Sequence, residues 1–141
     1  MEDKKIVVAY DGSSYSAKAL DMAASLAKTM SASVVLVSVA DMTRRMNSDV
    51  GNIEMVEAVF RREGAHALEL GKKHAAELGV LVADVLLEGS PADEILKYAQ
   101  AENACMIVVG SRGRGGFQRL MLGSTAQSLV TYSTIPVLVV K

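Results

Sequence analysis

The sequence has few of the residues that build stacking platforms, disulfides or charge-driven interfaces. Its 141 residues include no Trp, two Phe, four Tyr, two Pro and one Cys, and its formal net charge is −1. So few aromatic side chains leave little surface on which single-stranded nucleic acid could stack. A nearly neutral chain also has no long-range attraction to nucleic acid or to an anionic membrane. We therefore expect neither of these among its partners.

Metal and redox chemistry have little support in the sequence. The single cysteine, Cys105, lies in an apolar run and cannot form an internal disulfide, so we interpret it as a small buried hydrophobe. His66 and His74 are eight residues apart on one helical pattern, whereas zinc-binding pairs on a helix use the i, i+4 spacing. We expect no metal site made by the protein alone.

The chain also lacks a long apolar run and a leader-like N-terminus. No stretch of about 18 apolar residues is present, and the first five residues lead directly into a short strand pattern. Half of the residues are apolar and 22% are charged, which is a globular balance. We expect one domain, residues 1–141, in the cytoplasm.

Five short runs rich in β-branched residues alternate with helical patterns. Four of the runs are almost continuously apolar, as in strands that are buried on both faces of a parallel sheet. The run at residues 80–87 contains Asp84, which indicates a partly exposed or edge strand. The predicted strands are residues 5–9, 33–39, 80–87, 105–109 and 137–140.

The helical patterns complete a β-α-β alternation. Helix start signals are clearest at Ser90-Pro91, where an N-cap residue and a proline precede Asp93 and Glu94 in the first turn. The predicted helices are residues 14–30, 52–78, from 91 onward, and 124–132. This alternation predicts an α/β fold, an open doubly wound five-stranded parallel sheet with helices on both faces.

One connection is long for this fold. The polar stretch at residues 41–51 follows the second strand and reads DMTRRMNSDVG. Connections from a strand to a helix in this kind of fold usually have about 2–6 residues. Two interpretations remain open: a surface loop, or a lid that orders over a bound ligand.

A glycine spacing near the C-terminus carries the strongest functional signal. Gly110, Gly113 and Gly123 followed by Ser124 give G-x2-G-x9-G-S, between the fourth strand and the last helix. Glycine lets backbone N–H groups approach an anion closely, and a helix N-terminus adds unpaired N–H groups and partial positive charge. The spacing predicts a phosphate-binding loop.

Polar residues follow the other strands at the same predicted edge of the sheet. Ligands of open α/β sheets bind beyond the carboxyl ends of the strands. Asp11 follows the first strand within Asp-Gly-Ser-Ser, and two interpretations apply to it. It could be a turn-and-cap residue, or it could accept hydrogen bonds from ribose hydroxyls, for which a carboxylate is a natural partner.

Taken together, these segments resemble the universal stress protein family, in its ATP-binding branch. The resemblance rests on the opening VVAYDGS, the GSP that begins the third helix, the G-x2-G-x9-G-S loop and the ending TIPVLVV, and it covers nearly the whole chain. The family fold implies the strand order 3-2-1-4-5.

The resemblance also implies a set of nucleotide contacts. Asp11 would bind the ribose hydroxyls, the main chain of Val39 would contact adenine, and Gly113 would contact the α- and β-phosphates. The other implied contacts are Ala9 and Tyr10 beside the nucleoside, Val109 and Gly110 beside the ribose, and Gly123, Ser124 and Thr125 at the phosphate tail. ATP, ADP or AMP would be the ligand, with Mg²⁺ or Mn²⁺ held through its phosphates.

The arginines of the glycine loop have no fixed role in this scheme. Arg112, Arg114 and Arg119 could either reach the γ-phosphate or remain in solvent. We include Arg114 among the candidate nucleotide contacts.

The resemblance implies a regulatory binding protein that forms a homodimer. Val137–Val140 would be an apolar edge strand, which is normally a pairing site, and family members dimerise through it. We expect a nucleotide-binding stress-response regulator whose nucleotide state alters its conformation or its choice of protein partner. Hydrolysis should be slow or absent, because no positioned base or protein-anchored metal is evident.

Alternative functions remain. The chain could be a slow ATPase, or it could phosphorylate itself on Ser124 or Thr125. A phospho-receiver using Asp11 is disfavoured because no acidic pair follows the first strand. A purely structural dimer is disfavoured because the glycine signature is complete. The loop is neither a P-loop, since G-x-x-x-x-G-K-[ST] is missing, nor a dinucleotide fingerprint, since it follows the fourth strand.

Overall fold

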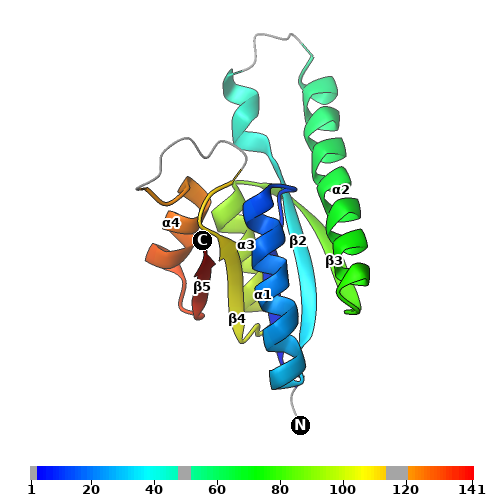
Figure 1. Cartoon of the computed structure of the whole chain (residues 1–141). Coiled ribbons are helices and arrows are strands. Elements are labelled where there is room, and N and C mark those ends of the chain that lie inside the picture. The colour runs from blue at the N-terminus through cyan, green and yellow to red at the C-terminus, as the bar shows by residue number, and fades with distance from the viewer. Residues whose placement is uncertain (1–2, 48–51, 114–120) are drawn as a thin grey trace.

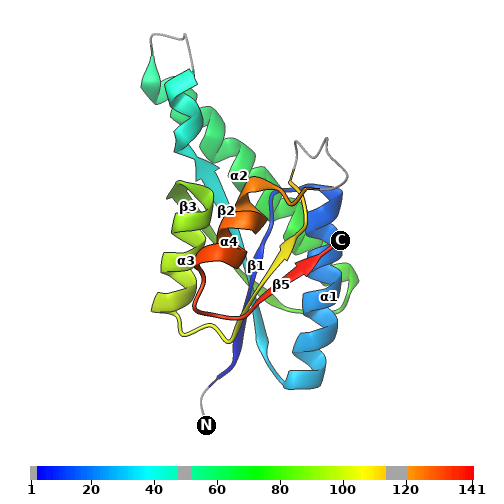
Figure 2. The ribbon, with the colours of Figure 1, turned by 90° about the vertical axis from the view of Figure 1, so that its left-hand side faces the viewer.

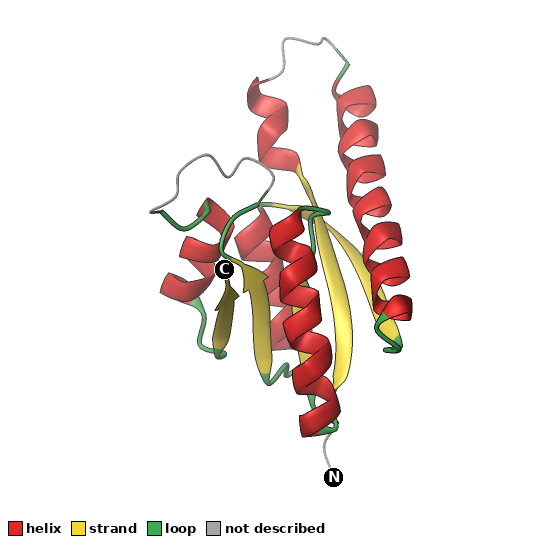
Figure 3. Cartoon of the chain, viewed as in Figure 1, coloured by secondary structure: helices red, strands yellow, loops and turns green. Residues whose placement is uncertain are grey.

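The computed structural model describes residues 3–47, 52–113 and 121–141, and in them one five-stranded parallel sheet forms the centre of the molecule (Figures 1 and 3). The strand order is β3-β2-β1-β4-β5, as predicted. The strands are β1 Lys5–Ala9, β2 Ser33–Asp41, β3 Val82–Gly89, β4 Met106–Gly110 and β5 Val137–Val140.

Helices cover both faces of the sheet, which confirms the doubly wound arrangement (Figure 2). One face carries α1 (Ser14–Met30) and α2 (Ile53–Glu77), and the other carries α3 (Pro91–Ala101) and α4 (Ser124–Tyr132). No helix in the described part of the chain is long and apolar enough to cross a membrane.

β1 is the centre of the core. Ile6, Val7 and Val8 have no exposed surface, because β2 and β4 flank the strand and helices cover both of its faces. Ile6 and Val8 pack toward α1 and α2, and Val7 packs toward α3 and α4. This two-sided burial explains why the strand has a continuous apolar sequence instead of an alternating one.

The edge strands also agree with the sequence-based expectations. β3 lies at one edge of the sheet and β5 at the other. The Asp84 carboxylate on β3 is partly exposed and lies 3.7 Å from Lys72 Nζ on α2. The charge that interrupts this apolar run is therefore paired at the surface.

The structure departs from the sequence-based expectations mainly at residues 41–51, which were expected to form a surface loop or a lid. β2 continues to Asp41, and Met42–Asn47 forms a 3-10 helix, η1, rather than irregular loop. The apolar side chain of Met42 drives this ordering, since it is buried against Ala40 and Phe60. Residues 48–51, the rest of the proposed lid, lie outside the described residues.

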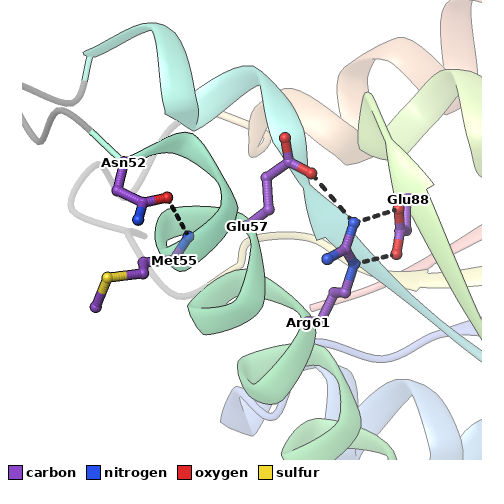
Figure 4. Close-up of polar contacts among 5 residues, drawn as sticks. All are labelled: Asn52, Met55, Glu57, Arg61 and Glu88. Carbon is purple, nitrogen blue, oxygen red and sulfur yellow. Dashed lines mark hydrogen bonds and ion pairs between the residues drawn. The ribbon is translucent and has the colours of Figure 1, made fainter.

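α2 extends beyond the strand ends and is tied to β3 near its start (Figures 1 and 4). Arg61 pairs with Glu57 one turn earlier on α2 and with both carboxylate oxygens of Glu88 on β3. The hydrogen bond from Arg61 is the main cause that lowers the pKa of Glu88 below its usual value. Asn52 caps the helix by accepting a hydrogen bond from the N–H of Met55. Of these contacts, the pair between Arg61 and Glu88 links the projecting part of α2 to the carboxyl end of β3.

Replacing Gly110 with alanine should destabilise the fold. A Cβ there would lie 2.8 Å from the backbone carbonyl carbon and oxygen of Tyr15, and backbone cannot move aside cheaply. We expect a loss of about 1–3 kcal/mol in the free energy of unfolding, measured by urea denaturation.

Gly64→Ala is the matched control for this change. A Cβ at Gly64 would meet the end of the Leu86 side chain at 2.5 Å, which can rotate away, and alanine favours the helix. Its stability should stay within about 1 kcal/mol of wild type. Equal stability of Gly110→Ala and wild type would contradict the close packing of β4 on α1.

Candidate functional site

A cleft of about 510 Å³ opens at the carboxyl edge of the sheet. Every predicted site residue in the described part of the chain lines it; Arg114 lies outside that part. These lining residues are Ala9, Tyr10, Asp11, Val39, Val109, Gly110, Gly113, Gly123, Ser124 and Thr125. The cleft therefore joins the ends of β1, β2 and β4 with the start of α4.

Asp11 lines the cleft and shapes the turn after β1. Its Oδ1 accepts a hydrogen bond of 2.9 Å from the Ser13 N–H, and Gly12 has a φ of 86°. Ser13, rather than Asp11, is the N-cap of α1, since its hydroxyl accepts from the Ser16 N–H. The cap interpretation of Asp11 was therefore wrong, whereas the turn interpretation is confirmed.

Gly113 brings the glycine loop against this carboxylate. A Cβ at position 113 would lie 2.8 Å from Asp11 Oδ2. Any side chain at this position would displace either the loop or the carboxylate. The middle glycine of the spacing is thus needed for contact between the loop and the turn after β1.

Backbone hydrogen bonds close the ends of the glycine loop. The Gly123 N–H donates to the Ser111 carbonyl at 2.7 Å, and the Ser111 N–H donates to the Val140 carbonyl at 2.7 Å. A Cβ on Gly123 would approach Arg112 Cα to 3.1 Å. Both ends of the loop are therefore anchored to the carboxyl end of the sheet.

α4 begins where the loop closes. Gly123 is its N-cap and offers no side chain, so the first N–H groups of the helix have neither an intrahelical partner nor a side-chain cap. Ser124 and Thr125 occupy this first turn and line the cleft. The helix N-terminus gives this end of the cleft partial positive charge and donors suited to an anion.

The walls between these polar groups are apolar. Ala9, Val37, Val39 and Val109 belong to the core on the side of α3 and α4, and Pro91 and Ile95 of α3 continue the same wall. An apolar cleft with a few convergent polar groups is the usual form of a small-molecule site.

Tyr10 lines the cleft, but its ring belongs to the opposite core. The residue is 5% exposed, and its ring packs against Gly71 of α2, where an added Cβ would lie 3.1 Å from Tyr10 Cδ1. Burial, and then the nearby charges of Asp11 and Asp21, raise the pKa of its hydroxyl. The bulk of the tyrosine is thus accommodated beneath α2.

The sequence did not predict one group of cleft residues, at the end of β2. Arg44 on η1 pairs with Glu63 on α2, with Nη1 and Oε2 2.8 Å apart, and its guanidinium carbon lies 4.4 Å from the centroid of the Phe60 ring. All three side chains line the cleft. Phe60 and Gly64 lie on the buried side of α2, but nothing in the sequence linked Arg44 to them.

The arginines of the glycine loop are described only in part. Arg112 lines the cleft, and its Nε lies 3.4 Å from the Met121 carbonyl oxygen to which it donates. Arg114 and Arg119 lie outside the described residues. Met121 and Leu122, two apolar residues at the end of the loop, are 62% and 37% exposed, so neither enters the core.

Metal-binding groups do not gather in the described part of the chain. No three His, Cys, Asp or Glu side chains there come close enough to hold a metal ion. His74 instead bridges two helices, with Nε2 2.7 Å from Asp21 Oδ1 on α1.

Known proteins match this chain along its whole length. Universal stress protein MJ0531 of Methanocaldococcus jannaschii is 38% identical over 139 residues, which cover 98% of this chain and 82% of that protein. Universal stress protein YxiE of Bacillus subtilis is 39% identical over 145 residues, covering 97% and 98%. The solved structure of MJ0577, a universal stress protein from M. jannaschii, superposes with a TM-score of 0.84 at 28% identity, covering 100% of this chain and 97% of that one.

More distant structures share the fold. One is a universal stress protein in complex with cAMP, with a TM-score of 0.73 at 22% identity, covering 98% of this chain and 97% of that one. Another is the Archaeoglobus fulgidus universal stress protein in complex with dAMP, with a TM-score of 0.71 at 24% identity and full coverage of both chains. The model of the universal stress protein family matches residues 3–141. The chain therefore belongs to the universal stress protein family.

Proposed function

We propose that the cleft at the carboxyl edge binds an adenine nucleotide. The observation that carries this proposal is the contact between Asp11 and Gly113, which sets a carboxylate for ribose hydroxyls beside a glycine loop for phosphates. A volume of about 510 Å³ suits a ligand of this size. Solved proteins of the same fold hold cAMP and dAMP, both of which are adenine nucleotides.

The order of groups along the edge supports a proposed orientation of the nucleotide. β2, β1 and β4 are neighbours in the sheet; Val39 lies near the carboxyl end of β2, and Asp11 and Gly113 follow β1 and β4. The base would lie at the end of β2 and the ribose over Asp11. The phosphates would meet the N–H groups of Gly113 and of the first turn of α4, with hydroxyls from Ser124 and Thr125.

A divalent cation would be carried by the nucleotide. Because the described residues offer no cluster of three metal-ligating side chains, Mg²⁺ or Mn²⁺ would be coordinated mainly by phosphate oxygens and water. The cation would neutralise phosphate charge at the end of the cleft that Arg112 lines.

A binding and regulatory role follows from this chemistry. Fast phosphoryl transfer needs a metal fixed by the protein and a base or water-orienting group at the phosphate. Gly113, Ser124 and Thr125 supply binding groups rather than a base. We therefore expect slow turnover at most, with the nucleotide state controlling conformation or partner choice in the cytoplasm.

Removing the Asp11 carboxylate should abolish retention of the nucleotide. Asp11→Ala removes the acceptor for the ribose hydroxyls, and charge-assisted hydrogen bonds are worth about 1.5–3 kcal/mol, or roughly 10- to 150-fold in affinity. Gly113→Val should do the same by displacing that carboxylate. The measurement is mass spectrometry of nucleotide released from freshly purified protein, with ATP titration by calorimetry.

The control is Asp93→Ala, which removes an exposed carboxylate in the first turn of α3, outside the cleft lining. It should bind like wild type. The proposal fails if wild-type protein neither releases nor binds adenine nucleotide, or if Asp11→Ala and Gly113→Val bind ATP as wild type does. Rapid conversion of ATP to ADP that both substitutions abolish would favour the ATPase alternative.

We further propose that β5 pairs with β5 of a second copy. The four residues of β5 are apolar and only partly buried at the sheet edge. Residues 136 and 140 accept hydrogen bonds from β4, through Ile107 N–H and Ser111 N–H. Backbone N–H groups along a strand point alternately to its two sides. Those of residues 137 and 139 therefore point away from β4 and are positioned for another strand.

Val139→Pro tests this pairing with little disturbance to the sheet. It removes an outward N–H while leaving the bonds to β4 in place, and edge strands tolerate proline. We expect a dimer for wild type and a monomer for the variant in sedimentation equilibrium at micromolar concentration. Wild type that sediments as a monomer would refute the proposed dimer.

A further inference from the structure

Arg44, Phe60 and Glu63 form a cluster that the contacts assigned so far do not use. η1 supplies Arg44, and one face of α2 supplies Phe60 and Glu63. The guanidinium carbon of Arg44 lies 4.4 Å from the centroid of the Phe60 ring, and its Nη1 lies 2.8 Å from Glu63 Oε2. All three line the cleft at the end of β2. We call them the β2-end cluster.

The cluster is held in place by the fold. Phe60 is 8% exposed and packs with Ala40 and Met42, so the ring under Arg44 is fixed in a small core of its own. Gly64, one turn after Phe60, lies so close to β2 that its Cβ would be 3.8 Å from the Ala40 nitrogen. The cluster therefore lies next to the carboxyl end of β2, close in sequence to Val39.

The charge of the cluster argues against a phosphate site. Glu63 offsets the charge of Arg44 at 2.8 Å, which leaves little net attraction for an anion. The other arginine that lines the cleft in the described residues, Arg112, belongs to the glycine loop after β4, with β1 between the two strand ends. A nucleotide whose phosphates meet the glycine loop directs its base toward Arg44.

Guanidinium planes stack well on heterocyclic bases. Arginine is planar, weakly hydrated and able to stack on aromatic faces, which the compact ammonium of lysine cannot do. An ion pair with a carboxylate and an aromatic ring fixes the orientation of the guanidinium in advance, so less side-chain entropy is lost on binding.

We propose that Arg44 is a base-contacting residue, whose guanidinium, oriented by Phe60 and Glu63, stacks on the adenine ring and forms the outer wall of the base site. This inference rests on the proposed function, since it assigns a residue to the same cleft. It gives η1 a role in ligand affinity, and it places the base between the apolar wall at Val39 and the Arg44 side chain.

The test is the affinity of Arg44 variants for AMP and for ATP, measured by calorimetry at low and high salt. Arg44→Ala should weaken both nucleotides by the same factor, about tenfold, because stacking on a base is lost and the phosphates are not involved. Arg44→Lys should weaken binding nearly as much, since it keeps the charge but loses the plane. The factor should be the same at both salt concentrations. Arg62→Ala, an exposed arginine on α2 outside the cleft lining, is the matched control and should bind like wild type.

Other outcomes would overturn the inference in distinguishable ways. If wild type binds AMP and ATP but Arg44→Ala binds both equally well, Arg44 does not contact the base, while the proposed function stands. If the loss is larger for ATP than for AMP, falls with salt and is rescued by Arg44→Lys, Arg44 contacts phosphate instead. If wild type binds neither nucleotide, the proposed function itself fails. Arg44 is exposed, so unfolding of the variants is not expected, and thermal melting of each variant checks this.

Discussion

Pairing between β1 and β4 is the interaction on which the cleft depends. The chain builds β1, β2 and β3 outward in one direction and then returns to place β4 on the other side of β1. The register matches Ile6 with Met106 and Val8 with Val108 along fully or mostly buried strands. Because the chain after β1 enters α1 on one face, and the chain after β4 leads to α4 on the other, the two connections diverge above this pair. A crevice at such a switch point is the expected ligand site of an open α/β sheet.

The burial of these strands on both faces helps to explain why much of the fold and site could be predicted from the sequence. Continuous apolar runs locate strands buried on both faces, and a strand-to-helix glycine spacing is a local signal, so the strands, α4 and the Gly113 loop were all found. The β2-end cluster was missed because its members come from two elements that meet only in three dimensions. Arg44 lies in a polar stretch, where the burial of Met42 against Phe60 helps to order η1 and bring Arg44 to the cleft.

The two ends of the cleft are built on different principles. The β4 end uses backbone, with glycines at 113 and 123 where an added Cβ would press on neighbouring atoms, and a helix start without a side-chain cap. The β2 end uses side chains, held by an ion pair, a ring and a small satellite core. Backbone donors suit phosphate, whose oxygens accept from any direction, whereas a flat base needs a flat partner. The pair between Arg61 and Glu88 links α2 to β3 near this second end (Figure 4).

Asp11 has a role in the fold, and the ribose contact that we propose uses the same carboxylate. Its Oδ1 orders the turn after β1 through the Ser13 N–H, while Ser13 caps α1 in its place. Its Oδ2 lies beside Gly113, at the junction of the two connections. The turn bond uses Oδ1, whereas the glycine loop faces Oδ2. The turn interpretation is therefore compatible with the ribose contact that we propose. Because the turn already fixes the direction of the carboxylate, less conformational entropy would be lost when a nucleotide binds.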